Sequence, residues 1–185
     1  MGDEVALVFW GGVNYEEFVN YFYLANLFLF PFSFIQSYIG FKEIVVMKKE
    51  DHYNLLKASS RVLLFALIFA VLLFGIINLL AEWRIIKVNI VENKSIILLF
   101  LTTGILRLNY AIFSAYFSCF ASVRILKRAN IVSLSLLTIF VVLVYKYNDS
   151  VIDLAIFLCA IWTARILTWA YFAHIIQVSQ KINKN

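Results

Sequence analysis

The sequence predicts an all-α integral membrane protein with about five transmembrane helices. Of its 185 residues, 63% are hydrophobic and 15% are charged, and the mean hydropathy is +0.88. This composition leaves too little polar surface to cover a water-soluble globule. The apolar residues come in runs of about 20, the length that a helix needs to cross about 30 Å of hydrocarbon. Helices are expected because a segment in lipid must satisfy its own backbone hydrogen bonds.

Five apolar runs are predicted to span the membrane. Four are bounded by charged or amide residues, at positions 62–80, 96–120, 131–145 and 152–176. The fifth, 18–41, contains Pro31, which a membrane helix tolerates when its neighbours satisfy the freed carbonyl, so we expect a kinked span. We treat residues 1–185 as a single transmembrane domain.

The apolar stretch 5–13 is about half as long as a span. We expect it to be the end of a further, partial N-terminal helix, as in a truncated or split protein. The alternative is a re-entrant segment of a small intact membrane protein. Residues 1–17 contain four acidic residues and no Lys or Arg, which argues against a secretory signal peptide.

Lysine and arginine are distributed unevenly between the two sides of the predicted bundle. Ten lie in the connections 42–61 and 124–128 and in the C-terminal tail, and four lie in the other connections. The positive-inside bias places the ten, and the C-terminus, in the cytoplasm. The net charge of +5 is therefore explained by the orientation of the helices in the membrane, and no nucleic-acid partner is expected. The ten residues are Lys42, Lys48, Lys49, Lys57, Arg61, Arg124, Lys127, Arg128, Lys181 and Lys184; the four are Arg84, Lys87, Lys94 and Lys146.

Sequence patterns of enzymes and nucleotide-driven motors are missing. The six glycines provide no phosphate-binding loop, and no serine lies in a G-x-S-x-G turn. His52 and His174 have no second ligand at helical spacing. We expect no enzyme, no cofactor and no metal site.

Two arginines, Arg107 and Arg165, fall near the middle of predicted spans. A central Arg costs about 2.5 to 3.5 kcal/mol on insertion scales, and no Asp or Glu lies at a matching depth in the sequence, so an external anion is one solution. Arg165 lies one turn from Trp162 and Trp169, whose rings can hold a guanidinium or stack on sugars. Arg107 belongs to a polar stripe at steps of three or four residues that suits a wet cavity. The stripe consists of Thr103, Arg107, Tyr110, Ser114 and Ser118.

The residues predicted to bind substrate are Arg107, Arg165, Tyr110, Trp162 and Trp169. The alternative interpretation is that each arginine bonds backbone carbonyls, pairs with an acid of another lobe, or extends toward the interface.

Three segments follow a common order seen in one family of exporters. Residues 2–25 contain Asp3 in an apolar run, a turn at Gly11-Gly12, and then Tyr15 and the small residue Ala25. Residues 48–61 are a charged connection into a basic-flanked helix, and 115–128 are a small-residue helix end followed by a basic turn. In this order they resemble the multidrug/oligosaccharidyl-lipid/polysaccharide (MOP) exporters, and among them the O-antigen and polysaccharide flippases. Pro31 departs from that pattern, because the family's proline usually closes its helix.

The resemblance implies the second lobe of a two-lobe, MATE-like transporter in the bacterial inner membrane. The implied activity is translocation of an undecaprenyl-diphosphate-linked oligosaccharide by alternating access, with membrane lipids and a missing N-terminal lobe, or an equivalent chain, as partners. Two alternatives stay open. One is a drug or ion antiporter of the same superfamily, and the other is a non-transporting membrane subunit of a glycan-assembly complex.

Overall fold

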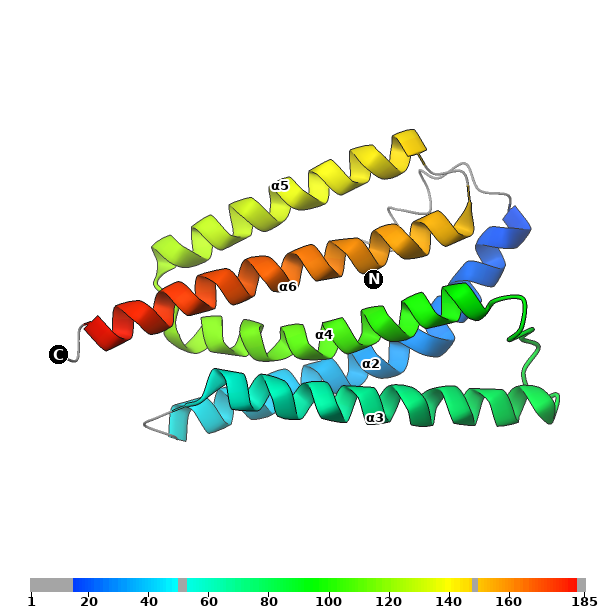
Figure 1. The fold of residues 1–185 in the computed structure, drawn as a ribbon, viewed down its shortest axis with the longest axis horizontal. Helices are drawn as coiled ribbons and strands as arrows, with labels where there is room; N and C mark the ends of the chain where they lie inside the picture. The colour runs from blue at the N-terminus through cyan, green and yellow to red at the C-terminus, as the bar shows by residue number, and fades with distance from the viewer. Residues whose placement is uncertain (1–14, 50–52, 148–149, 183–185) are drawn as a thin grey trace.

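The computed structural model describes residues 15–49, 53–147 and 150–182, which form five long helices and no strand (Figure 1). The predicted all-helical fold is confirmed for this part of the chain. The predicted partial helix at 5–13 lies outside the described residues. The helices are α2 (Tyr15–Lys49), α3 (Leu55–Glu82), α4 (Lys94–Phe120), α5 (Val123–Tyr147) and α6 (Val151–Ile182).

Each of the five helices is long and apolar enough to cross a membrane, which confirms the predicted number of spans within the described residues. Four helices, α2, α3, α5 and α6, extend at least six residues beyond one end of their apolar runs, whereas α4 extends only two. α2 continues to Lys49 and α3 begins at Leu55, so most of the predicted connection 42–61 is helical. Hydropathy marks only the segment inside hydrocarbon, whereas a helix that leaves the hydrocarbon keeps its backbone hydrogen bonds in the headgroup region.

Pro31 lies inside α2, and the helix is continuous through it. Proline removes one backbone N–H from the ladder and crowds the preceding turn. Nearby hydroxyls add bonds to the same stretch of backbone: Ser33 Oγ donates to the carbonyl of Leu29 at 3.1 Å, and Ser37 Oγ donates to that of Ser33 at 3.3 Å. Neither of these two bonds is to the carbonyl of Leu27, the group that loses its helical N–H donor at Pro31.

Helix α4 is the centre of the bundle. It packs against α2, α3 and α6, whereas α5 packs mainly on α6 at the periphery (Figure 1). In the apolar 18-residue stretch of α4, 50% of the residues are buried inside the protein, whereas 11% are buried in the corresponding stretch of α5. The buried half of α4 therefore faces protein, and most of α5 lies on the outside of the bundle.

Small residues allow the other helices to approach α4 closely. Gly104 of α4 lies against the ring of Phe32 in α2, and a Cβ at this position would overlap that ring. On α3, the buried residues Ala58, Ala66 and Ala70 recur on one face. The Ser59 hydroxyl of α3 donates to Asn109 Oδ1 of α4 at 2.7 Å. Small residues and interhelical hydrogen bonds are the usual means of holding helices together in lipid.

Helix α3 ends in a tight turn with an unusual residue. The backbone N–H of Ile85 donates to the carbonyl of Leu80, and that of Arg84 donates to Ala81. These are the two bonds of a Schellman motif, whose left-handed position is normally glycine. Here Arg84 occupies it, with a φ of 58°.

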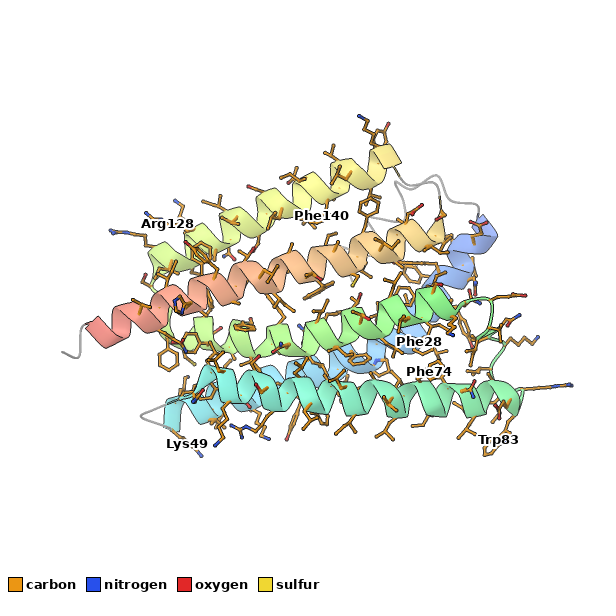
Figure 2. All side chains as sticks on the ribbon, in the orientation of Figure 1. Phe28, Lys49, Phe74, Trp83, Arg128 and Phe140 are labelled. Atoms are coloured by element: carbon orange, nitrogen blue, oxygen red, sulfur yellow. The ribbon has the colours of Figure 1, made fainter. Side chains whose placement is uncertain are left out.

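Consecutive helices run in opposite directions, so their ends gather into two groups (Figure 1). Lys49 and Arg128 lie at the same end of the bundle, and Trp83 lies at the other (Figure 2). The basic ends of α2 and α5 therefore share one end of the bundle with the C-terminal end of α6.

Candidate functional site

All five residues predicted to bind substrate lie together at the contact between α4 and α6. Arg107 and Tyr110 are on α4, and Trp162, Arg165 and Trp169 are on α6. Spacings of three, four and seven residues place the side chains of each helix on one face, and these two faces meet. We call these five residues the arginine–aromatic cluster.

Both guanidiniums of the cluster lie over the same indole ring. The Arg107 Cζ is 5.1 Å from the ring centroid of Trp162, and the Arg165 Cζ is 5.2 Å from it. Arg165 Cζ also lies 5.5 Å from the ring centroid of Tyr110. These distances are within the range in which an aromatic face attracts a cation. Trp162 thus holds two positive charges near the middle of two predicted spans.

The aromatic side chains form a frame around the arginines. The Tyr110 ring contacts Trp162 edge-on at a centroid distance of 5.5 Å, and it contacts Trp169 in the same way at 5.2 Å. Trp169 also packs on Phe117, with centroids 4.4 Å apart. The two edge-to-face contacts of Tyr110 favour particular ring orientations, and the guanidiniums lie against these packed rings.

The two arginines differ in exposure. Arg107 is 7% exposed, whereas Arg165 is only half-buried. Thr103, one turn from Arg107, is fully buried, and its hydroxyl has no hydrogen-bond partner among the described residues. The predicted polar stripe therefore does not line one open cavity: Thr103 and Arg107 are enclosed by helices, and Ser118 is exposed.

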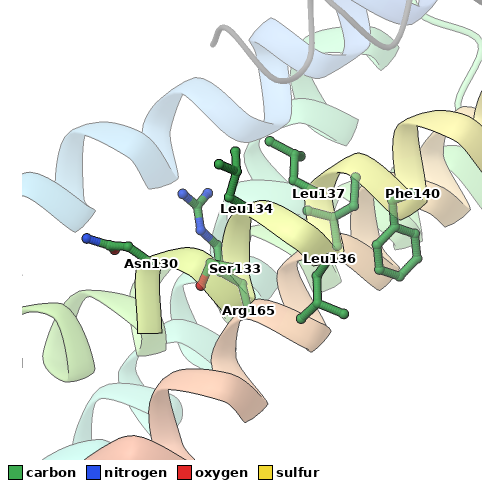
Figure 3. Close-up of a pocket in the computed structure, with 8 residues that line it drawn as sticks. Asn130, Ser133, Leu134, Leu136, Leu137, Phe140 and Arg165 are labelled. Atoms are coloured by element: carbon green, nitrogen blue, oxygen red, sulfur yellow. The ribbon is translucent and has the colours of Figure 1, made fainter. Parts of the chain in front are cut away.

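Arg165 reaches a cavity of about 280 Å³ between α5 and α6 (Figure 3). Asn130 and Ser133 lie at one end of this α5–α6 crevice, and Phe140 lies at the other. The Nε1 of Trp169 donates to Ser133 Oγ at 3.3 Å, which ties the wall of the crevice to the cluster. The crevice is lined by Asn130, Ser133, Leu134, Leu136, Leu137, Phe140, Ile161 and Arg165.

The sequence reasoning missed the contribution of α5. Asn130 and Ser133 are three positions apart in α5, a spacing that places them on one face of the helix. That signal was present in the sequence, but nothing in it indicated that this face meets Arg165.

The described carboxylates lie at or near helix ends, away from the cluster. Glu17 and Asp153 are in first turns, Glu82 ends α3, Glu92 is in the following turn, and Glu43 lies in the last part of α2. Within the described ranges, no three His, Cys, Asp or Glu side chains are close enough to hold a metal ion. The cluster is therefore a cationic and aromatic site, which suits an anion better than a metal.

The fold defines the class of protein: an all-helical, multi-pass membrane protein with five candidate spans in the part of the chain that the structure describes. Comparison with family models, with curated proteins and with solved structures finds no match. The resemblance to the MOP exporters stays a prediction.

Proposed function

We propose that this chain forms one lobe of a transporter that moves a lipid-linked, diphosphate-bearing glycan across the bacterial inner membrane. The observation that carries the proposal is the pair of guanidiniums, Arg107 and Arg165, held over Trp162 at the α4–α6 contact. Arg forks recognise phosphate oxygens with paired hydrogen bonds, and Arg165, the more exposed of the two, is the one that a substrate can reach in this conformation. Charges inside a membrane are costly and are generally retained where they serve a pathway.

The surroundings of the pair support an amphiphilic substrate. The rings of Tyr110, Trp162 and Trp169 border the arginines, and because both tryptophans are buried they position the guanidiniums and leave the glycan to lie outside the cluster. The α5–α6 crevice brings Arg165 close to the lipid-facing helix α5. A substrate with one charged group and one apolar chain can satisfy both environments.

The proposed orientation places the basic end of the bundle in the cytoplasm. Ten of the 14 Lys and Arg residues outside the span centres belong to that end or to the C-terminal tail. The positive-inside bias then gives a cytoplasmic C-terminus.

Translocation needs a second wall around the substrate. We propose that another lobe, in the same polypeptide or on an associated chain, faces this one, and that the two rock about a site near the midplane. A gradient supplies the driving force, because the sequence contains no nucleotide-binding loop.

The test is deletion of the coding region in the host, followed by assay of the leaflet that holds the lipid-linked glycan. Deletion should trap the glycan in the cytoplasmic leaflet, where an added glycosidase cannot reach it in spheroplasts. Re-expression of the intact gene should restore access, and re-expression of an Arg107→Ala, Arg165→Ala double variant should not.

Normal glycan access after deletion would overturn the proposal. A change in drug or ion tolerance with normal glycan access would favour an antiporter. Loss of glycan synthesis itself would favour an assembly subunit.

A further inference from the structure

The α5–α6 crevice is amphiphilic along its length. The guanidinium of Arg165, the amide of Asn130 and the hydroxyl of Ser133 lie toward one end, and Leu137 and Phe140 continue toward the other (Figure 3). A cation and two hydrogen-bonding groups next to an apolar wall match a ligand with an anionic head and a hydrocarbon chain.

We infer that this crevice binds the junction between the phosphate and the hydrocarbon chain of an anionic amphiphile, and that it makes no contact with the glycan. The inference rests on the proposed function and deepens it by naming the part of the substrate that is recognised. Arg165 holds the phosphate, and Leu137 and Phe140 hold the first part of the chain.

The size of the crevice supports this division. Its volume of about 280 Å³ is at the lower limit of pockets that enclose drug-sized molecules. It can take a phosphate and a short length of chain, but an oligosaccharide must lie outside it.

The place of Arg165 along α6 argues against an ordinary bilayer phospholipid as the occupant. Arg165 lies in the middle part of α6 (Val151–Ile182), and half of the hydrocarbon thickness, about 15 Å, separates the midplane from the headgroups. The phosphate of a resting phospholipid stays at the headgroup level. A phosphate at Arg165 therefore belongs to an amphiphile on its way across.

The direction of the crevice defines how the amphiphile is loaded. Asn130 and Ser133 lie on the part of α5 nearer to its basic beginning, where Arg124 and Arg128 are exposed, and Phe140 lies farther along the helix. The head group therefore points toward the basic end of the bundle. Loading takes place from the leaflet at that end, between α5 and α6.

The experiment uses the full chain in nanodiscs of zwitterionic lipid and measures binding of dodecyl phosphate by calorimetry. Inorganic phosphate and dodecyl maltoside are the comparison ligands: the first has the anion without the chain, and the second has a chain without the anion. Two variants target the crevice. Arg165→Gln removes the charge, and Leu137→Trp fills the apolar part.

Each variant has a matched control. Arg124→Gln removes an exposed charge from the start of α5, and Leu143→Trp adds the same bulk to α5 at a residue that does not line the crevice. We expect Arg165→Gln and Leu137→Trp each to weaken dodecyl phosphate binding about tenfold or more, because a charge-assisted bond or the chain site is lost. The controls should bind as the unmodified chain does, and Arg165→Lys should lose less than Arg165→Gln.

Unchanged binding in both crevice variants would overturn the inference. Equal competition by inorganic phosphate would also overturn it, because the site would then read a free anion. The outcome is separable from the proposed function. If the crevice variants lose binding but deletion of the gene leaves glycan transport normal, the inference about the crevice stands and the proposed transport function is rejected. If deletion abolishes glycan transport but the crevice variants bind normally, the transport function stands and the inference is rejected.

Discussion

The guanidinium carbon of Arg107, on α4, lies 5.1 Å from the ring centroid of Trp162, on α6. The contact joins the central helix of the bundle to its neighbour. Because Arg165 uses the same ring at 5.2 Å, the positions of two charges depend on one aromatic side chain.

This shared ring predicts that Trp162→Leu weakens both arginine contacts at once. A double-mutant cycle between Arg107→Met and Trp162→Leu should give a coupling of about 0.5 to 2 kcal/mol, the range for a cation over an aromatic face. The measurement is thermal unfolding of the purified chain in detergent. A cycle between Arg107→Met and Tyr171→Leu, an exposed ring on the same helix, should give none. Additive effects of Arg107 and Trp162 would show that the contact has no energetic weight.

The two arginines are predicted to act in transport and not only in folding. In the host, Arg107→Ala or Arg165→Ala should lower translocation by more than it lowers the amount of protein in the membrane. Lys at either position should keep part of the activity, because an ammonium retains the charge but loses the paired hydrogen bonds. Membrane abundance and glycan access are measured side by side.

Two other outcomes of the arginine variants have separate meanings. Normal transport per molecule in both Ala variants would remove these residues from the site. A parallel fall of abundance and transport would show that the arginine pairs with an acid of another lobe, because its loss would leave that acid buried without a partner.

Gly104→Ala is predicted to destabilise the contact between α2 and α4. The added methyl group would overlap the ring of Phe32, which is fully buried and also packs on Phe69. Overpacking of this kind costs about 1 to 3 kcal/mol. A lower midpoint of thermal unfolding is the expected result.

The control for Gly104 is Gly75→Ala, since a Cβ there meets nothing within 4 Å. That variant should be neutral or slightly stabilising, because alanine has the better helix propensity. Phe32→Leu should recover part of the stability in the Gly104→Ala background. Equal midpoints for Gly104→Ala and Gly75→Ala would contradict the close packing of α2 on α4.

Arg84→Gly is predicted to stabilise the protein. Arg84 has a φ of 58°, and a side chain in the left-handed region costs about 1 to 2 kcal/mol relative to glycine. Arg84→Ala should give no gain, because it removes the charge but keeps the Cβ. Unfolding midpoints of the two variants decide the matter, and a gain in Arg84→Ala alone would assign the effect to charge.

The orientation of the bundle is predicted from the distribution of basic residues. Tags inserted between α2 and α3, or placed at Asn185, should report the cytoplasm, and a tag at Asn148 should report the periplasm. The insertion point lies within 50–54, since Lys42–Lys49 belongs to α2. The reverse labelling pattern would show that the assigned orientation is wrong.

The sequence by itself was sufficient for the class of fold and the number of spans. A run of about 20 apolar residues has few alternatives to a membrane helix, because unpaired backbone groups cannot be left in hydrocarbon. It was also sufficient to place Arg107 and Arg165 near the centre of spans, since that depends only on distance along one helix. It was insufficient for helix ends such as Lys49, because hydropathy does not report helix beyond the hydrocarbon region.

Only the tertiary structure decided which faces meet. The contact of Arg107 and Arg165 with one indole depends on how α4 rotates against α6, and periodicity within each helix does not contain that angle. The same holds for the crevice, where Ser133 of α5 meets Trp169 of α6. In a bilayer, an apolar helix face gains little free energy when it leaves lipid to contact another helix. Helix pairing therefore depends on close packing at residues such as Gly104 and on a few polar contacts. Which helices pack together therefore depends on how well two helix surfaces fit each other. The sequence of one helix describes only one of the two surfaces.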